Sequence, residues 1–153
     1  MHGNTPDMKK KTLPQVKSGG LSKVVVRKRA VCGAPHLARL HAGPVTIPAA
    51  IGKSGISHRK REGDGASPAG DFRLDAVFFR SDRLARLAVP IGSRPTHRSM
   101  GWCDDPTSAS YNRPVTTGAK ARHEQLWRED GVYDVVVTTS HNQRPRVLGA
   151  GSA

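Results

Sequence analysis

The chain has 153 residues and a formal charge of +13, from 25 Lys and Arg against 12 Asp and Glu, and its length is typical of one domain. No run approaches the ~20 consecutive apolar residues of a membrane-spanning helix, and two cysteines cannot form the disulfide framework of a small secreted scaffold. The charge favours polyanions as nonspecific partners, although a solvated basic surface with a basic tail is the simpler explanation.

Residues 1–22 are predicted to form a basic flexible tail, because they hold three consecutive lysines, scattered Pro and Gly, and no apolar periodicity. A secretory signal needs a basic stretch followed by ~7–15 apolar residues. Residues 12–18 (TLPQVKS) do not supply such a run. We therefore expect no signal peptide, and the sequence alone leaves the compartment open.

From residue 23 onward the pattern predicts a mostly β domain. Short runs rich in β-branched and aromatic residues fit a pleated, buried surface, and segments rich in Gly, Pro and Asn separate them as turns. The predicted strands are 24–26, 45–47, 72–74, 77–79 and 133–139, the last being the strongest. One or two short helices are also predicted, over 119–128, which has a partial apolar face, and over 80–87.

Residues 60–72 (KREGDGASPAGDF) form the most unusual segment, because three glycines with Asp64 and Pro68 favour a fixed, tightly turned loop. The run of oxygen ligands that a calcium loop needs is missing. A phosphate loop would end in Gly-Lys-Ser or Gly-Lys-Thr, which this segment also lacks. The simplest interpretation is a structural turn between strands.

The cysteines and histidines give weak signals. The seven histidines show no metal-ligand spacing, so we predict no metal and no cofactor. Cys103 stands between Trp102 and Asp104, where a small packed side chain is the more common interpretation. Cys32 has His36 four residues later, yet a Cys–His pair is catalytic only if the fold brings a base to the thiol.

Several motifs, taken in order, resemble the YkuD-type L,D-transpeptidase catalytic domain over residues 23–153. The motifs are 52–56 (GKSGI), 60–74 (KREGDGASPAGDFRL), 101–106 (GWCDDP), 111–114 (YNRP), 126–128 (LWR) and 133–137 (YDVVV). The resemblance implies a β-sandwich domain of the cell envelope or periplasm that cross-links peptidoglycan. In that family a Cys thiolate attacks a stem-peptide carbonyl, and the acyl-enzyme passes to an amine of a neighbouring stem.

The sequence departs from that pattern at the catalytic residues. The family's His follows a stretch similar to Gly151-Ser152-Ala153, and its Gly-Cys segment lies further on. Neither Cys32 nor Cys103 matches the nucleophile, and no histidine matches the base. We therefore expect residues 23–153 to be the N-terminal portion of the domain, an incomplete sandwich truncated before its catalytic His and Cys and inactive as this chain. A separate polypeptide that supplies both residues is the other interpretation of the same departure.

The remaining motif residues are expected to form the substrate-binding surface, with peptidoglycan stem peptides as the partner and no catalytic residue in the chain. The candidates are His58, Lys60, Arg61, Ser67, Trp102, Tyr111 and Asn112. The basic members suit carboxylate partners, and the glycine-rich loop would frame the cleft.

The alternative function is a non-catalytic basic protein that binds nucleic acid or cell-wall polymer. A truncated sheet should also leave strand 133–139, or its neighbour, with an unpaired edge.

Overall fold

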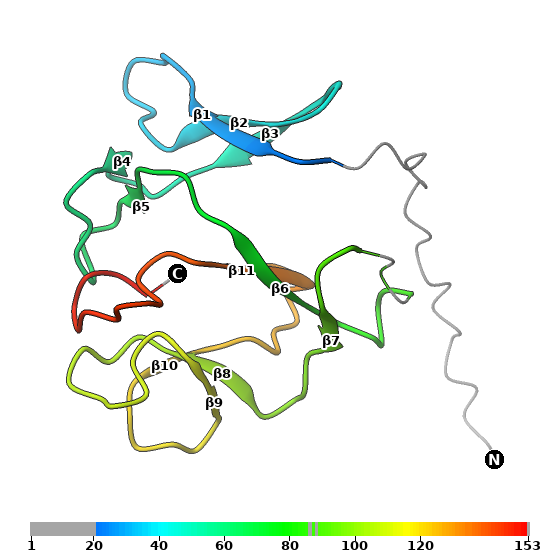
Figure 1. The fold of residues 1–153 in the computed structure, drawn as a ribbon, viewed down its shortest axis with the longest axis vertical. Coiled ribbons are helices and arrows are strands. Elements are labelled where there is room, and N and C mark those ends of the chain that lie inside the picture. Colours follow the sequence, from blue (N-terminus) through cyan, green and yellow to red (C-terminus); the bar gives the residue numbers. More distant parts are fainter. Residues whose placement is uncertain (1–20, 86, 88, 153) are drawn as a thin grey trace.

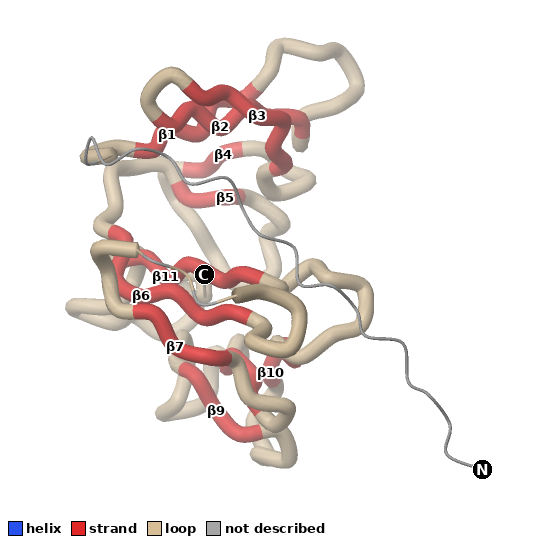
Figure 2. The backbone as a smooth tube through the Cα atoms, turned by 90° about the vertical axis from the view of Figure 1, so that its right-hand side faces the viewer, coloured by secondary structure: helices blue, strands red, loops and turns tan. Residues whose placement is uncertain are grey.

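The computed structural model describes residues 21–85, 87 and 89–152, and within them it contains strands and loops but no helix (Figures 1 and 2). The eleven strands are β1 (Val24–Lys28), β2 (Leu37–Ala42), β3 (Val45–Ala50), β4 (Ile56–Ser57), β5 (Ser67–Pro68), β6 (Leu74–Phe79), β7 (Ser93–Pro95), β8 (Met100–Cys103), β9 (Pro114–Thr116), β10 (His123–Gln125) and β11 (Val135–Thr139). The mostly β prediction is confirmed. All but two residues of the predicted tail lie outside the described residues.

The first sheet is an antiparallel meander of β1, β2 and β3 at one end of the molecule (Figure 1). A two-residue turn joins β2 to β3, with Ala42 opposite Val45. Gly43 holds the first central position with φ +58°, which a type II′ hairpin turn needs there. The turn fixes the register and therefore decides which side chains share each face.

Two further three-stranded sheets and one short strand pair make up the rest. The middle sheet has the order β11-β6-β7, with β11 antiparallel and β7 parallel to β6. The last sheet has the order β10-β8-β9 and is antiparallel. The two-residue strands β4 and β5 pair in parallel. The described strands thus form several small sheets, which follow one another along the long axis in Figure 1.

The hydrophobic core is small and lies mainly in the middle and last sheets. Its buried members are Ala38, Val77, Phe79, Cys103, Tyr111 and Leu126. Many aliphatic side chains of the sheets remain exposed, among them Val135 and Val137 of β11. Because β11 pairs only with β6 in the described part of the chain, it presents the unpaired edge expected for strand 133–139.

Both predicted helices are wrong. In the segment 119–128, residues His123–Gln125 pair with β8 as strand β10, so tertiary pairing overrides a weak local preference. In the segment 80–87, the amides of Arg83 and Leu84 donate to the carbonyl of Arg80 and close a single turn. No helix continues from that turn, and Arg86 lies outside the described residues.

No helix in the part of the chain that the structure describes has the length and apolar character to cross a bilayer.

Candidate functional site

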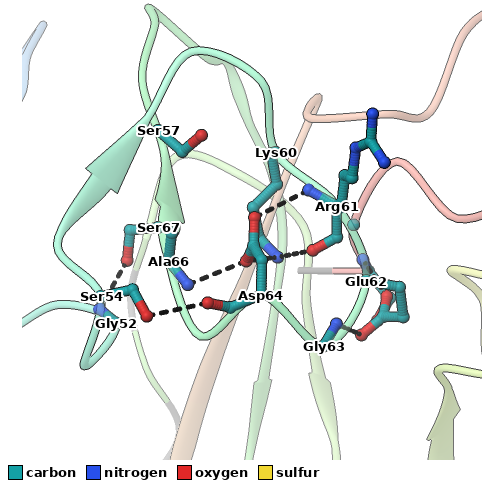
Figure 3. Close-up of polar contacts among 12 residues, drawn as sticks. Gly52, Ser54, Ser57, Lys60, Arg61, Glu62, Gly63, Asp64, Ala66 and Ser67 are labelled. Atoms are coloured by element: carbon teal, nitrogen blue, oxygen red, sulfur yellow. Dashed lines mark hydrogen bonds and ion pairs between the residues drawn. The ribbon is translucent and has the colours of Figure 1, made fainter.

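The glycine-rich loop between β4 and β5 is built around the carboxylate of Asp64 (Figure 3). This carboxylate lies 2.7 Å from the Lys60 ammonium and accepts the backbone N–H groups of Arg61 and Ala66, both at 2.8 Å. The hydrogen bond from Lys60, followed by the two backbone bonds, lowers the pKa of Asp64 to about 2. The Asp64 oxygens are therefore engaged within the loop.

Two further contacts join this loop to the turn after β3. The Gly52 N–H donates to the Ser67 hydroxyl at 3.0 Å, and the Ser54 hydroxyl donates to the Asp64 carbonyl at 2.8 Å (Figure 3). The backbones approach so closely that a Cβ on Gly52 would overlap the carbonyl oxygen of Gly65. The segments 52–55 and 64–67 thus form one compact double loop.

Glu62, next to this loop, connects it to distant parts of the chain. Its carboxylate accepts the Tyr111 hydroxyl at 2.6 Å, the Ser152 N–H at 2.8 Å and the Ser152 hydroxyl at 2.7 Å. Burial raises the pKa of Glu62, but the three hydrogen bonds outweigh it and the net shift is downward. Burial and the adjacent Glu62 carboxylate raise the pKa of Tyr111.

Asn112 organises the segment 141–152, which we call the strap. Asn112 is fully buried and has φ +56°, a left-handed conformation that Asn adopts more readily than most residues. Its side-chain N–H₂ donates to the carbonyls of His141 and Asn142, and its side-chain oxygen accepts the Trp102 indole N–H at 3.0 Å. The three motifs around residues 62, 102 and 111 therefore meet at the strap.

The strap is further fixed from within. The Asn142 side chain donates to the carbonyls of Val147 and Gly151 and accepts the Val147 N–H, while the Gly151 N–H donates to the Tyr111 hydroxyl at 2.9 Å. The His141 ring packs edge-on against Phe72, with 5.2 Å between centroids. Burial lowers the pKa of His141, and the Lys60 charge adds to that shift.

The structure brings together four of the seven predicted site residues. These four lie at the strap or at the glycine-rich loop next to it, and they are Lys60, Trp102, Tyr111 and Asn112. Ser67 lies in the double loop, and the side chains of His58 and Arg61 are exposed. The Lys60 ammonium is already paired with Asp64.

Sequence reasoning missed the central residues of this network, which are Glu62, His141, Asn142 and Ser152. Glu62 and Ser152 are 90 positions apart, so no local pattern links them. The usable signal was the turn-forming sequence Asn142-Gln143-Arg144-Pro145, which ends the strongest strand.

An open groove of about 390 Å³ lies beside the junction between the end of β11 and the start of the strap. It is lined by Arg73, Asp75, Ser140, Gln143 and Arg144. Guanidinium and amide groups suit a carboxylate ligand, and a carboxylate suits an amine. Within the groove the Arg73 guanidinium lies 3.6 Å from the Asp75 carboxylate, so these two charges already face each other.

The two thiols are placed differently. Cys32 is exposed, and Cys103 is fully buried in β8. His123 lies directly opposite Cys103, yet its Nδ1 is 2.9 Å from the Ala121 carbonyl oxygen and its ring covers Gly101. In residues 21–85, 87 and 89–152 no hydrogen bond joins a cysteine sulfur to a histidine.

Over the same described ranges, no group of three or more His, Cys, Asp or Glu side chains is arranged to hold a metal ion.

Comparisons of the chain with family models, with curated proteins and with solved structures gave no match.

Proposed function

We propose that residues 23–153 form the scaffold portion of an L,D-transpeptidase-type domain, which binds peptidoglycan stem peptides and performs no acyl transfer with its own thiols. The observation that carries the proposal is the convergence on the strap. Three motifs on which the resemblance depends, around residues 62, 102 and 111, join in one hydrogen-bond network, in which Glu62 lies 49 positions from Tyr111 while Trp102 and Asn112 are near neighbours in sequence. A chance similarity of separate motifs does not require that they meet in space.

The groove beside the strap is the proposed binding surface for the stem peptide. Arg144 would hold its carboxylate together with Arg73, and Asp75 would face an amine, although Arg73 and Asp75 are already an exposed ion pair at 3.6 Å that the ligand would share. This placement differs from the expected role of Lys60, whose ammonium is engaged by Asp64.

The thiol geometry supports the absence of acyl transfer. A catalytic Cys needs a base within hydrogen-bond reach and access to substrate. Cys103 is buried, and the histidine opposite it is turned toward Gly101. In a serine protease, losing a nucleophile and base that act as a unit costs about 10⁶-fold in kcat, so a binding surface alone would leave negligible turnover.

The test has two readouts on the full chain. Incubation with a tetrapeptide stem and an acceptor stem, followed by mass spectrometry, should give neither cross-linked product nor a covalent adduct on Cys32 or Cys103. Titration of the same stem peptide, followed by NMR, should show saturable binding. Arg73→Gln/Arg144→Gln should weaken that binding about tenfold or more, because two charge-assisted contacts are lost.

The matched control is Arg94→Gln/Lys120→Gln, which removes two exposed charges outside the motifs and should leave the affinity unchanged. A thioester on either cysteine would overturn the inactive assignment. Absence of saturable binding to the stem peptide would overturn the scaffold assignment.

A further inference from the structure

Positive charge is strongly segregated along this chain. Residues 8–61 hold 13 Lys and Arg and no Asp or Glu, whereas residues 62–153 hold 12 Lys and Arg against 11 Asp and Glu. Almost all of the net charge therefore belongs to the first part of the sequence, which includes the whole β1–β3 sheet.

One face of that sheet gathers the arginines. Arg27 of β1 lies directly opposite Arg39 of β2, so both side chains point to the same face, which we call the arginine face. Arg29 lies just past the end of β1, and its N–H donates to the Leu37 carbonyl at 2.8 Å, which keeps it beside β2. His41, also on this face, has its ring nitrogen 3.0 Å from the Thr46 hydroxyl. The three arginines are exposed.

The arginine face carries no compensating charge from its own sheet. Like charges directly opposite each other on neighbouring strands destabilise the pairing. No carboxylate pairs with Arg27, Arg29 or Arg39 in the described residues. Some arginines elsewhere do pair with carboxylates, as Arg80 does with Asp82 and Arg122 with Asp104. Arg27 and Arg39 differ from the other exposed, unpaired arginines in being cross-strand neighbours on one face of a sheet.

The residue types indicate which polyanion fits. No Phe, Trp or Tyr occurs before Phe72, so the sheet offers no aromatic platform for the unstacked bases of a single strand. Adjacent guanidiniums need closely spaced anions, and guanidinium matches phosphate with two parallel hydrogen bonds. Duplex nucleic acid carries one charge per ~1.7 Å of axis on a rigid frame, which meets both needs.

We propose that the arginine face of the β1–β3 sheet is a docking surface for the phosphate backbone of duplex nucleic acid. The contacts are to phosphates and not to base edges, so binding is independent of base sequence. This proposal is independent of the transpeptidase assignment, because it uses a different sheet and different residues.

The experiment measures binding of the full chain to a labelled 20-base-pair DNA duplex by fluorescence anisotropy between 50 and 200 mM KCl. Each phosphate contact contributes about 0.9 to the slope of log affinity against log salt. Arg27→Gln/Arg39→Gln should therefore reduce that slope by about 2. The control Arg94→Gln/Arg113→Gln removes the same charge from other strands and loops and should leave the slope unchanged.

Folding of the variant is checked by a thermal melt, in which Arg27→Gln/Arg39→Gln should be at least as stable as the wild type because a like-charge pair is removed. An unchanged slope in that variant overturns the proposal. An equal loss in the control also overturns it, because binding would then follow total charge. Stronger binding per phosphate to a flexible glycerol-phosphate polymer than to the duplex would assign the face to a different partner and refute the one named.

Discussion

Glu62 is the residue that joins the glycine-rich loop to the strap by hydrogen bonds. One of its carboxylate oxygens accepts three hydrogen bonds, from the Tyr111 hydroxyl and from both polar groups of Ser152. Hydrogen bonds to a charged acceptor are stronger than those between neutral groups. The ionised form of Glu62 is therefore part of the folded structure, which its lowered pKa also indicates.

We predict that Glu62→Gln lowers the free energy of unfolding at pH 7 by about 2 kcal/mol, because charge-assisted hydrogen bonds become neutral ones. The folded pKa of Glu62 lies below its ordinary value of 4.5. Its contribution is therefore present above pH 4.5 and is lost as the pH falls through the folded pKa. Urea denaturation at a series of pH values from 7 to 3 should show the wild type and the variant converging in acid.

The control for this prediction is Asp71→Asn, a change of the same kind at an exposed position. It should shift the unfolding free energy by no more than about 0.5 kcal/mol. A difference between wild type and Glu62→Gln that persists unchanged at pH 3 would refute the assigned role of the carboxylate.

At the scale of the element, the double loop of residues 52–55 and 64–67 depends on the missing side chain of Gly52. A Cβ there would lie 2.6 Å from the carbonyl carbon of Ala66, which is backbone and cannot move aside as a flexible side chain does. The same loops are fastened by Ser54 and Ser67. The glycine is thus a packing requirement of the loop pair.

We predict that Gly52→Ala lowers the free energy of unfolding by about 1–3 kcal/mol, as forced overpacking does. Gly92→Ala is the matched change, since a Cβ at Gly92 meets nothing within 4 Å. It should be neutral or slightly stabilising. Equilibrium denaturation of both variants measures the difference, and equal stabilities would show that the loops separate easily.

The strands that sequence reasoning predicted are those with the strongest side-chain signal. The last five residues of the run at 133–139 form β11, and the valines at 24–26 are part of β1. Of the runs 72–74 and 77–79, the second lies in β6 and the first contributes only Leu74. β2 was missed because its sequence, LARLHA, contains no β-branched residue. It forms a strand because β1 and β3 pair with it on both sides.

The candidate site was predictable only in part for a related reason. Trp102, Tyr111 and Asn112 stood out because they belong to unusual motifs. The strap and Glu62 acquire their roles from contacts across 49 to 90 positions, which no spacing rule describes. The wrong helix at 119–128 has the same origin, since β8 needed a backbone partner.

At the scale of the whole molecule, β11 is an edge strand without the usual protection. Its sequence VVVTT contains neither a charged residue nor a proline, the two residue classes that commonly protect an edge strand. Val135 and Val137 lie opposite the buried Phe79 and Val77, so they continue the core face of β6, yet each is about two-fifths exposed. An apolar edge of this kind is a site for strand pairing between molecules.

We therefore predict concentration-dependent association of the wild-type chain, measured by sedimentation velocity. Val137→Lys should suppress the association, because a charge on the exposed edge opposes pairing. Val147→Lys places the same charge on an exposed strap residue and should leave association unchanged. Equal suppression by both variants would indicate simple charge repulsion and not pairing at β11.

The uneven distribution of aromatic residues has a consequence for optical work on this protein. Both tryptophans and both tyrosines lie beyond residue 100, with Trp127 stacked on the Arg80 guanidinium at 3.7 Å and Trp102 bonded to Asn112. Intrinsic emission therefore reports on the last sheet, the strap and the end of β6, next to which Arg80 lies, and β1 to β3 contribute no chromophore. A transition confined to that meander is spectrally silent in the near ultraviolet, while backbone amide exchange registers it in full.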